Sequence, residues 1–500
     1  MKRLSINTPV VIGILVAFVA VNLIAAKLYH KPQETMETYA VGNRQMPWFF
    51  VCFTYMAGWY VGSTYTGWVG NSVDIGLFPQ YEMVYSIGSL LFMYLFARPV
   101  WSWGKHYNLE TPSDFMGVRY NSPAFQKFYS VFMLIVDGAW LIIEIITLAY
   151  IINVSTNGAV SMTAGVWISG IVVGLYTTIG GVNATAITSV IQGFSFVVVG
   201  SILFIYIAYK AYGGFVPLYE MISLHKPELL YLPKESGLQQ MWIVSVITGT
   251  LGSYCWPTTF QRLYLSSSPR ETKKTLYIAP ICAVIVVFLI LVPAMGVSLM
   301  DDAPADSQIA EFFIANKYSG AVGLGLVGCF AGAAAMGSIS ATANCISVPF
   351  AKDILTMIWK KTPVVKLAKW TTAAVFLFSM IIASVDIPQL NFFALILYDF
   401  VCMCIIPLVG GVFWKRGNSI GAWVSMGIGC ICALLQNLTD IFASTSMGGT
   451  LIGMILSAIA YIACGFIFGK QSHIDEMFDV LKKYDNDGNY YPDKDMEIVK

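Results

Sequence analysis

The chain has 500 residues, of which 57% are hydrophobic and 11% are charged, and its formal net charge is +1. Soluble domains carry about 25% charged residues, so an ordinary water-exposed surface cannot be built from this chain. The near-neutral charge excludes a nucleic-acid-binding protein, which would carry a basic excess. The ten cysteines lie singly or as Cys-x-Cys pairs, which favours neither a disulfide framework nor a zinc site. The composition predicts an all-α membrane protein.

Thirteen apolar stretches are long enough to cross a bilayer as helices of about 20 residues. We predict spans at residues 8–27, 46–71, 77–100, 125–153, 160–178, 187–209, 240–262, 276–299, 319–348, 367–385, 390–413, 420–438 and 448–468. Most lysines and arginines fall in the loops after odd-numbered spans and in the C-terminal tail. The positive-inside rule therefore predicts a plasma-membrane protein with its N-terminus outside and its C-terminus in the cytoplasm.

Two spans carry helix breakers near their middle. Span 46–71 contains Gly58 and Gly62, and span 240–262 contains Gly252 and Pro257. Unwound backbone survives at membrane depth only beside a cavity or inside protein. If span 46–71 is the first core helix, span 240–262 is the sixth, which is typical of an inverted repeat that holds its substrate at two interrupted helices. The alternative is glycine that only packs helices closely.

This reading divides the chain into six parts. We predict a first peripheral helix, a first repeat, an external loop, a second repeat, two C-terminal helices and a cytoplasmic tail, at residues 1–30, 45–210, 211–239, 240–413, 414–470 and 471–500. Loop 300–317 is acidic and amphipathic, which predicts a short surface helix. The tail is polar, and we expect it to be mobile.

Four carboxylates fall well inside apolar spans, with no lysine or arginine beside them in sequence: Glu82, Asp137, Glu144 and Asp399. Each costs a few kcal/mol on membrane-insertion scales. Asp137 and Glu144 share one helix face with Trp140. Such acids could face a cavity and carry a cation or a proton. They could instead lie near the membrane surface, or stay protonated and hydrogen-bonded in a polar core.

Several short motifs, in order, resemble one known family over most of residues 35–430. They are Tyr39-Ala-Val-Gly-Asn-Arg44, Gly67-Trp-Val-Gly70, Thr111-Pro-Ser-Asp-Phe-Met-Gly-Val-Arg119, Tyr176-Thr-Thr-Ile-Gly180-Gly181, Trp256-Pro257, Gln261-Arg262, Ala333-Ala-Ala-Met336, Asp353-Ile354 and Trp414-Lys415-Arg416. The chain resembles the sodium:solute symporter family. The resemblance implies thirteen helices, the LeuT-type five-plus-five fold and secondary active transport by alternating access.

The resemblance also implies a sodium site where core helix one meets core helix eight. The matching positions are the carbonyls of Ala57, Tyr60 and Ala334 and the hydroxyl of Ser338. Oxygen-only ligation suits a hard cation. The chain departs from the family at Gly337, where a second hydroxyl is usual.

From this departure we expect a serine at position 337 to raise the apparent sodium affinity. A further departure is Ser189, where some members carry an aspartate for a second sodium site. Proton coupling through Glu82, Asp137 or Glu144 remains the alternative.

Candidate substrate residues cluster at the two breaks. Trp59, Ser63 and Thr64 lie in the first, Tyr254 and Trp256 in the second, and Glu82 follows Tyr81 as in sugar-carrying members of the family. Aromatic rings with a few hydroxyls suit a small polar organic solute. The alternative is that the tryptophans only pack helices.

The sequence thus predicts a sodium-coupled importer of such a solute, or a proton-coupled or cation-independent carrier on the same fold. We expect no enzyme, because no catalytic motif is visible; a solute sensor is the remaining rival.

Overall fold

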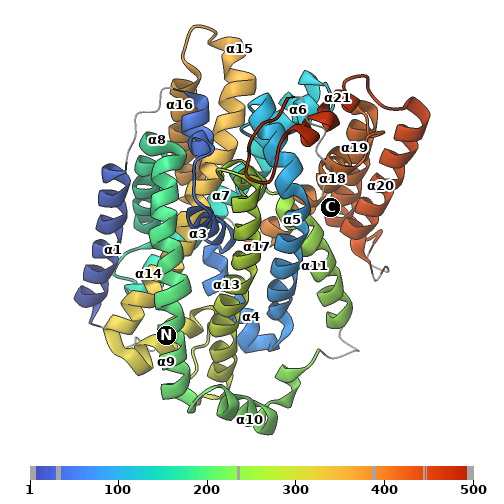
Figure 1. Cartoon of the computed structure of the whole chain (residues 1–500). Coiled ribbons are helices and arrows are strands. Elements are labelled where there is room, and N and C mark those ends of the chain that lie inside the picture. Colours follow the sequence, from blue (N-terminus) through green and yellow to red (C-terminus); the bar gives the residue numbers. More distant parts are fainter. Residues whose placement is uncertain are drawn as a thin grey trace.

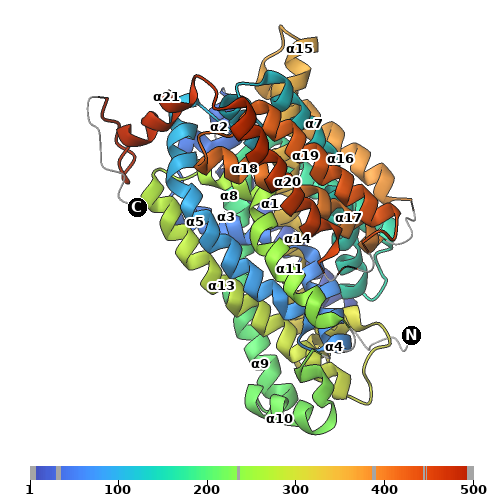
Figure 2. The same cartoon turned by 90° about the vertical axis from the view of Figure 1, so that its right-hand side faces the viewer.

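The computed structural model describes residues 7–29, 35–232, 237–385, 390–442, 445 and 447–492. In these residues the chain is built from helices, and the only β-type pairings are two isolated bridges, Met46 with Ser266 and Tyr484 with Tyr490. Most long helices run side by side along one direction (Figures 1 and 2). The prediction of an all-α membrane protein is confirmed.

The helices of 20 or more residues are α1 (Thr8–Leu28), α5 (Tyr81–Tyr107), α7 (Pro123–Ser155), α8 (Met162–Phe194), α13 (Pro269–Met295), α14 (Ala310–Phe350), α16 (Val364–Ala383), α19 (Ser419–Leu438) and α20 (Gly448–Phe468). Helix α9 (Ser201–Tyr212) continues α8 through the π-helical turn η4 (Ser195–Gly200). The shorter ones are α2 (Met36–Val41), α3 (Trp48–Trp59), α4 (Gly67–Ile75), α6 (Pro112–Arg119), α10 (Phe215–His225), α11 (Leu238–Gly252), α12 (Pro257–Phe260), α15 (Thr356–Ile358), α17 (Leu390–Cys402), α18 (Ile405–Phe413) and α21 (Ile474–Asp479).

Within the described residues, ten helices are long and apolar enough to cross a membrane. One of them, Met162–Tyr212, has 51 residues. Such a helix would be about 77 Å long, more than twice the hydrocarbon thickness. It is interrupted at Gly181, whose φ of 53° lies in the left-handed region, and this divides it into two helical segments, as the two predicted spans require. Each of the thirteen predicted spans overlaps a helical segment, and the number that crosses the bilayer stays a prediction.

The two interrupted helices are present where the breakers predict them. Helix α3 ends at Trp59, Tyr60 is extended with ψ 128°, and α4 begins only at Gly67 after the 3-10 turn η2 (Gly62–Tyr65). A Cβ atom at Gly62 would lie 2.7 Å from Thr147 Cγ2, so this unwound segment packs too closely against α7 for any side chain. The first break is therefore fixed by packing as well as by sequence.

The second break follows α11. A 3-10 turn, η6 (Ser253–Cys255), leads to Trp256 with ψ 127°, and Pro257 begins α12. Proline fits the first position of a helix because it has no N–H to leave unpaired there. Helix α14 is also interrupted, at Gly320 with φ 62°.

The acidic loop 300–317 does contain the start of a helix, but that helix is not on the surface. Helix α14 begins at Ala310, and the side chains of Glu311, Phe312 and Phe313 are buried. The expectation of a surface helix is wrong, because its two phenylalanines pack into the main hydrophobic core.

The tail is docked through residue 492, so the expectation of a mobile tail is wrong for this part. Helix α21 and the turn η11 (Val480–Lys483) lie against α5. The Trp103 indole N–H donates to the Met477 carbonyl at 2.7 Å, and Arg98 donates to the carbonyls of Leu481 and Tyr484 at 3.2 and 3.0 Å. Residues 493–500 of the predicted tail lie outside the described residues.

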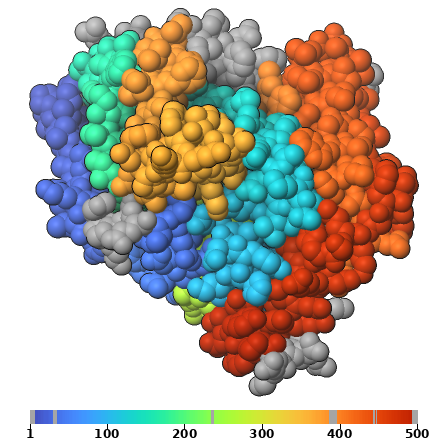
Figure 3. Space-filling model, turned by 90° about the horizontal axis from the view of Figure 1, so that it is seen from above, coloured from blue at the N-terminus to red at the C-terminus, as the bar shows by residue number. Residues whose placement is uncertain are grey.

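The two ends of the bundle differ. We call the end that carries α6, α15 and α21 the α6 end, and the opposite end, which carries α10, the α10 end (Figure 1). Seen from above, the α6 end is covered by packed side chains from residues near 110 (cyan), near 355 (gold) and in the tail (red) (Figure 3).

Candidate transport site

The main cavity has a volume of about 440 Å³ and lies at the two helix breaks. It is lined by Trp59 at the end of α3 and by Trp256 between α11 and α12. Further lining comes from α11 between Met241 and Gly249, the last turn of α19 and the first turn of α20. The cavity therefore extends from the breaks toward the α10 end.

The structure brings together some of the predicted substrate residues. Trp59, Glu82 and Trp256 line the cavity, and so does Ser338 of the predicted sodium site. The lining does not include Ser63, Thr64 or Tyr254.

The Tyr254 ring packs against Phe92 and Phe96, with centroids 5.4 and 5.0 Å apart. The 3-10 turn directs this side chain into the core, and its neighbour Trp256 into the cavity. Ser63 and Thr64 lie in η2, and their hydroxyls have no hydrogen-bond partner among the described residues.

Sequence reasoning did not assign several of the cavity residues to the substrate site: Tyr81, Tyr85, Trp140 and Tyr398 are all in its lining. Asp399, which the sequence marks as a carboxylate inside an apolar span, also lines the cavity. Tyr81 and Tyr85 are four residues apart on α5, a spacing that places them on one helix face with Glu82 beside them. That periodicity was a usable signal. Nothing local to Tyr398 marks it as a cavity residue, because α17 meets the cavity only through tertiary packing.

The predicted sodium ligands lie at the end of α3 and on α14. The last helical bond of α3 joins the Tyr60 N–H to the Met56 carbonyl at 2.9 Å. The carbonyls of Ala57 and Tyr60 therefore lie beyond the helical hydrogen-bond ladder. Ala334 is fully buried, and Ser338 is 2% exposed at the cavity wall.

Position 337 is a point of direct contact between α3 and α14. A Cβ atom at Gly337 would lie 2.3 Å from the Ala57 carbonyl oxygen and 2.8 Å from the Ala57 Cβ. A side chain at this position would force α3 and α14 apart, which argues against a serine completing the sodium site; the sodium affinity of such a variant stays a prediction. Glycine at this position lets the broken end of α3 approach α14 closely.

The two carboxylates of α7 do not line the cavity. Glu144 accepts a hydrogen bond from the backbone N–H of Gly62, with 3.0 Å between N and Oε2. It thus satisfies a backbone donor that the first break leaves unpaired. Asp137 is fully buried, and neither of its oxygens has a partner in the part of the chain that the structure describes.

Two substitutions distinguish a structural role of Glu144, as the acceptor for the Gly62 N–H, from a role in proton transport. We expect Glu144→Gln to keep transport near the wild-type rate, because its amide oxygen can still accept from Gly62. Glu144→Leu leaves that N–H buried and unpaired, at a cost of about 1–3 kcal/mol, and should reduce transport strongly. Transport in proteoliposomes measures both. Equal loss in both variants would instead indicate that Glu144 carries a proton.

On the α6 side of the cavity the helices are closed. The Arg262 Nε donates to the Thr54 carbonyl at 2.9 Å. Its guanidinium lies against α3, because a Cβ atom at Gly58 would be only 2.2 Å from Arg262 Nη2. Beyond it is a hollow of only about 30 Å³, lined in part by Asn344 and Cys345.

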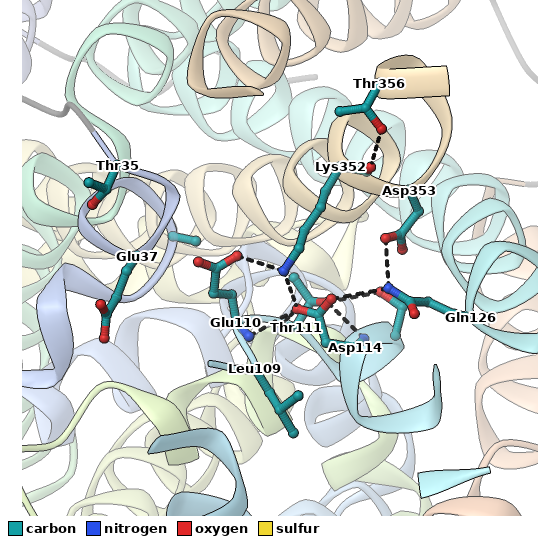
Figure 4. A network of polar contacts seen from close by, with 12 residues as sticks. Thr35, Glu37, Leu109, Glu110, Thr111, Asp114, Gln126, Lys352, Asp353 and Thr356 are labelled. Carbon is teal, nitrogen blue, oxygen red and sulfur yellow. Dashed lines mark hydrogen bonds and ion pairs between the residues drawn. The ribbon is translucent and has the colours of Figure 1, made fainter. Parts of the chain in front are cut away.

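A polar network closes the α6 end itself (Figure 4). Lys352, in the π-helical turn η10 (Ala351–Leu355), donates to Glu110 Oε2 at 2.9 Å and to Asp114 Oδ2 at 3.1 Å. Gln126 of α7 donates to Asp114 and Asp353 at 3.1 and 2.8 Å. Burial raises the pKa of the Glu110 carboxyl, and the nearby Lys352 opposes that rise. The network ties α6 and α7 to the end of α14.

Two interrupted helices with a cavity at the level of their breaks are typical of secondary transporters. The model of the sodium:solute symporter family matches residues 39–429. The chain belongs to this family and is a secondary active transporter.

Among curated proteins, the chain is 27% identical over 351 residues to the uncharacterized symporter YhjB of Bacillus subtilis, covering 69% of this chain and 71% of that protein. It is 25% identical to the human high affinity choline transporter 1, over 78% of this chain and 69% of that protein. A solved Na⁺-coupled sialic acid symporter, in a substrate-bound outward-open state, matches with a TM-score of 0.77 and 18% identity, over 92% of this chain and 98% of that chain. The structural match confirms the predicted fold.

Proposed function

We propose that this protein is a sodium-coupled importer of a small polar organic solute. The observation that carries the proposal is the contact of α3 with α14, where the Ala57 carbonyl released by the first break approaches Gly337, the residue before Ser338. Backbone and hydroxyl oxygens are the ligands that a hard cation prefers. Relatives support the coupling, since one solved neighbour is a Na⁺-coupled symporter.

Our proposal places the α6 end in the cytoplasm and the α10 end outside. The basic residues Arg44, Lys105, Lys352 and Lys415 lie in or beside segments of the α6 end, as the positive-inside rule requires. In this orientation the cavity extends outward and the Lys352 network closes the cytoplasmic side. The structure then represents an outward-facing state.

One sodium ion is enough to drive uptake. Entry down a tenfold gradient releases about 1.4 kcal/mol. A membrane potential of about 100 mV adds roughly 2.3 kcal/mol per charge. The sum of about 3.7 kcal/mol supports roughly 500-fold accumulation of a neutral solute.

The test uses the ion alone, so that no substrate has to be known. Purified full-length protein is heated in sodium chloride or in potassium chloride at equal ionic strength. We expect sodium to raise the melting temperature, because a ligand that binds only the folded state stabilises it. Ser338→Ala should remove most of this shift while leaving the melting temperature in potassium unchanged.

A sodium effect that is the same in wild type and Ser338→Ala would contradict the assigned ligands. The proton-coupled alternative rests on a different observation, the unpartnered carboxylate of Glu82 at the cavity. If sodium has no effect and transport rises with acidity, that alternative is correct.

A further inference from the structure

We propose that the cavity binds a solute through a cationic ammonium group, with Glu82 as its counter-ion. This inference rests on the proposed function, since it names the class of solute that the transporter carries. Three observations support it: the arrangement of aromatic rings, the charges in the cavity lining, and the hydrogen bonding of the two carboxylates.

The rings form two walls of one cavity. The first wall, on α3 and α5, contains Trp59, Tyr85 and Tyr81, with successive ring centroids 6.3 and 5.9 Å apart. The Trp59 indole N–H donates to Ser86 Oγ at 2.9 Å, which fixes this ring to α5. A rigid wall of this kind binds ligand without a large ordering cost.

The second wall is built from three other elements. Trp140 of α7 lies 5.4 Å from Trp256, and Trp256 stacks on Tyr398 of α17 with centroids 6.5 Å apart. All six rings of the two walls line the cavity. Aromatic faces carry negative charge density and attract an ammonium group, most strongly where water is excluded.

The charges of the lining have one sign. Glu82 and Asp399 are its acidic residues, and no lysine, arginine or histidine is among the described residues that form it. A carboxylate or phosphate on the solute would meet repulsion from these acids and no direct ion-pair partner. A cation would be attracted by both the acids and the rings.

The two acids are not equivalent. Asp399 accepts hydrogen bonds from Gln436 and Asn437, at 3.0 Å each, and from the Thr450 hydroxyl. These three neutral donors stabilise the Asp399 carboxylate by hydrogen bonds. Glu82 is 1% exposed, and its Oε2 has no partner among the described residues.

A buried carboxylate without a partner is costly in its charged form, and an incoming cation removes that cost. Of the two acids, Glu82 therefore gains more from an incoming cation. The cavity, at about 440 Å³, is within the size range of small-molecule sites.

The test compares two molecules of the same shape that differ in charge. Choline carries a trimethylammonium group, and 3,3-dimethylbutan-1-ol is its neutral carbon isostere. Both are titrated by calorimetry into purified full-length protein in sodium phosphate, with tetramethylammonium as a second cationic probe. We expect a cationic probe to bind at least tenfold more tightly than the neutral isostere, about the value of a desolvated cation–π contact.

Two variants locate the binding. Glu82→Gln should weaken binding of the cationic probes at least tenfold and leave the affinity for the neutral isostere unchanged. Trp140→Leu should also weaken binding of the cationic probes, and it changes no carboxylate. This variant therefore keeps the test valid if Glu82→Gln does not fold. The controls are Glu220→Gln, on exposed α10, and Trp370→Leu, whose side chain is 50% exposed on α16.

Binding of the neutral isostere within twofold of choline, or no binding of either cation, overturns the inference. So does unchanged cation affinity in a folded Glu82→Gln protein, because Glu82 would then be a neutral acid. The rise in melting temperature caused by sodium is measured separately, because it tests the proposed function and not this inference. A sodium shift without cation binding refutes this inference alone, and cation binding without a sodium shift refutes sodium coupling alone.

Discussion

Gly337→Ser is expected to abolish sodium binding rather than strengthen it. The new Cβ would lie 2.3 Å from the Ala57 carbonyl oxygen, a backbone atom that cannot rotate away. The end of α3 must then move from α14, which separates the oxygens proposed to share the ion. We expect at least a tenfold loss of sodium affinity, and an overpacking cost of about 1–3 kcal/mol.

The measurement is the sodium-dependent melting shift, with Gly337→Ala beside it to separate the volume of the side chain from its hydroxyl. Gly427→Ala on α19 is the control, because its Cβ would meet no atom within 4 Å. If Gly337→Ser binds sodium more tightly than wild type, the hydroxyl does complete the site and the packing explanation fails.

Lys352→Met is expected to open the α6 end. Lys352 is 31% exposed, and its partners Glu110 and Asp114 are 8% and 5% exposed, so the variant leaves two nearly buried acids without their cation. Repulsion between these acids should favour the state in which α6 and the end of α14 separate. Because the variant removes the cation and leaves the Thr111–Asp114 capping box intact, the local fold of α6 is preserved.

The measurement is the maleimide labelling of a cysteine thiol that lies inside the closed α6 end. Cys345 is 4% exposed beside Arg262 and the small hollow. Its rate of maleimide labelling, followed by peptide mapping, should rise about tenfold in Lys352→Met, which corresponds to about 1.4 kcal/mol. Lys470→Met is the control, since its pair with Asp475 is about half exposed on both sides and contributes little. Unchanged labelling of Cys345 would show that the network does not hold the end closed.

The helix breaks were predictable because their causes are local. Pro257 acts through its own backbone chemistry, and Gly58 and Gly62 mark the first break in the sequence, although close packing also requires both glycines. The identity of the cavity residues was only partly predictable. Tyr254 and Trp256 are only two residues apart, yet the Tyr254 side chain packs in the core and the Trp256 side chain lines the cavity. Which of them faces the cavity depends on the geometry of the 3-10 turn, and the sequence pattern does not reveal that geometry.

Gly337 shows a second limit. From the sequence alone, Gly337 is interpreted as a missing sodium ligand, because the family usually has a hydroxyl side chain at this position. In the structure it is the residue that permits two helices to touch, a role that small residues commonly have in membranes. Sequence alone cannot separate these readings, because the neighbour at issue, Ala57, is 280 positions away in the chain.

The docked tail has a consequence for how the molecule is made. Trp103 and the carbonyl that accepts its N–H, on Met477, are 374 positions apart. At about 5–20 residues per second, the ribosome delivers that carbonyl roughly 20–75 s after the tryptophan. The indole of α5 has no acceptor there until translation is nearly complete, so a chain truncated before α21 leaves this part of the α6 end uncovered.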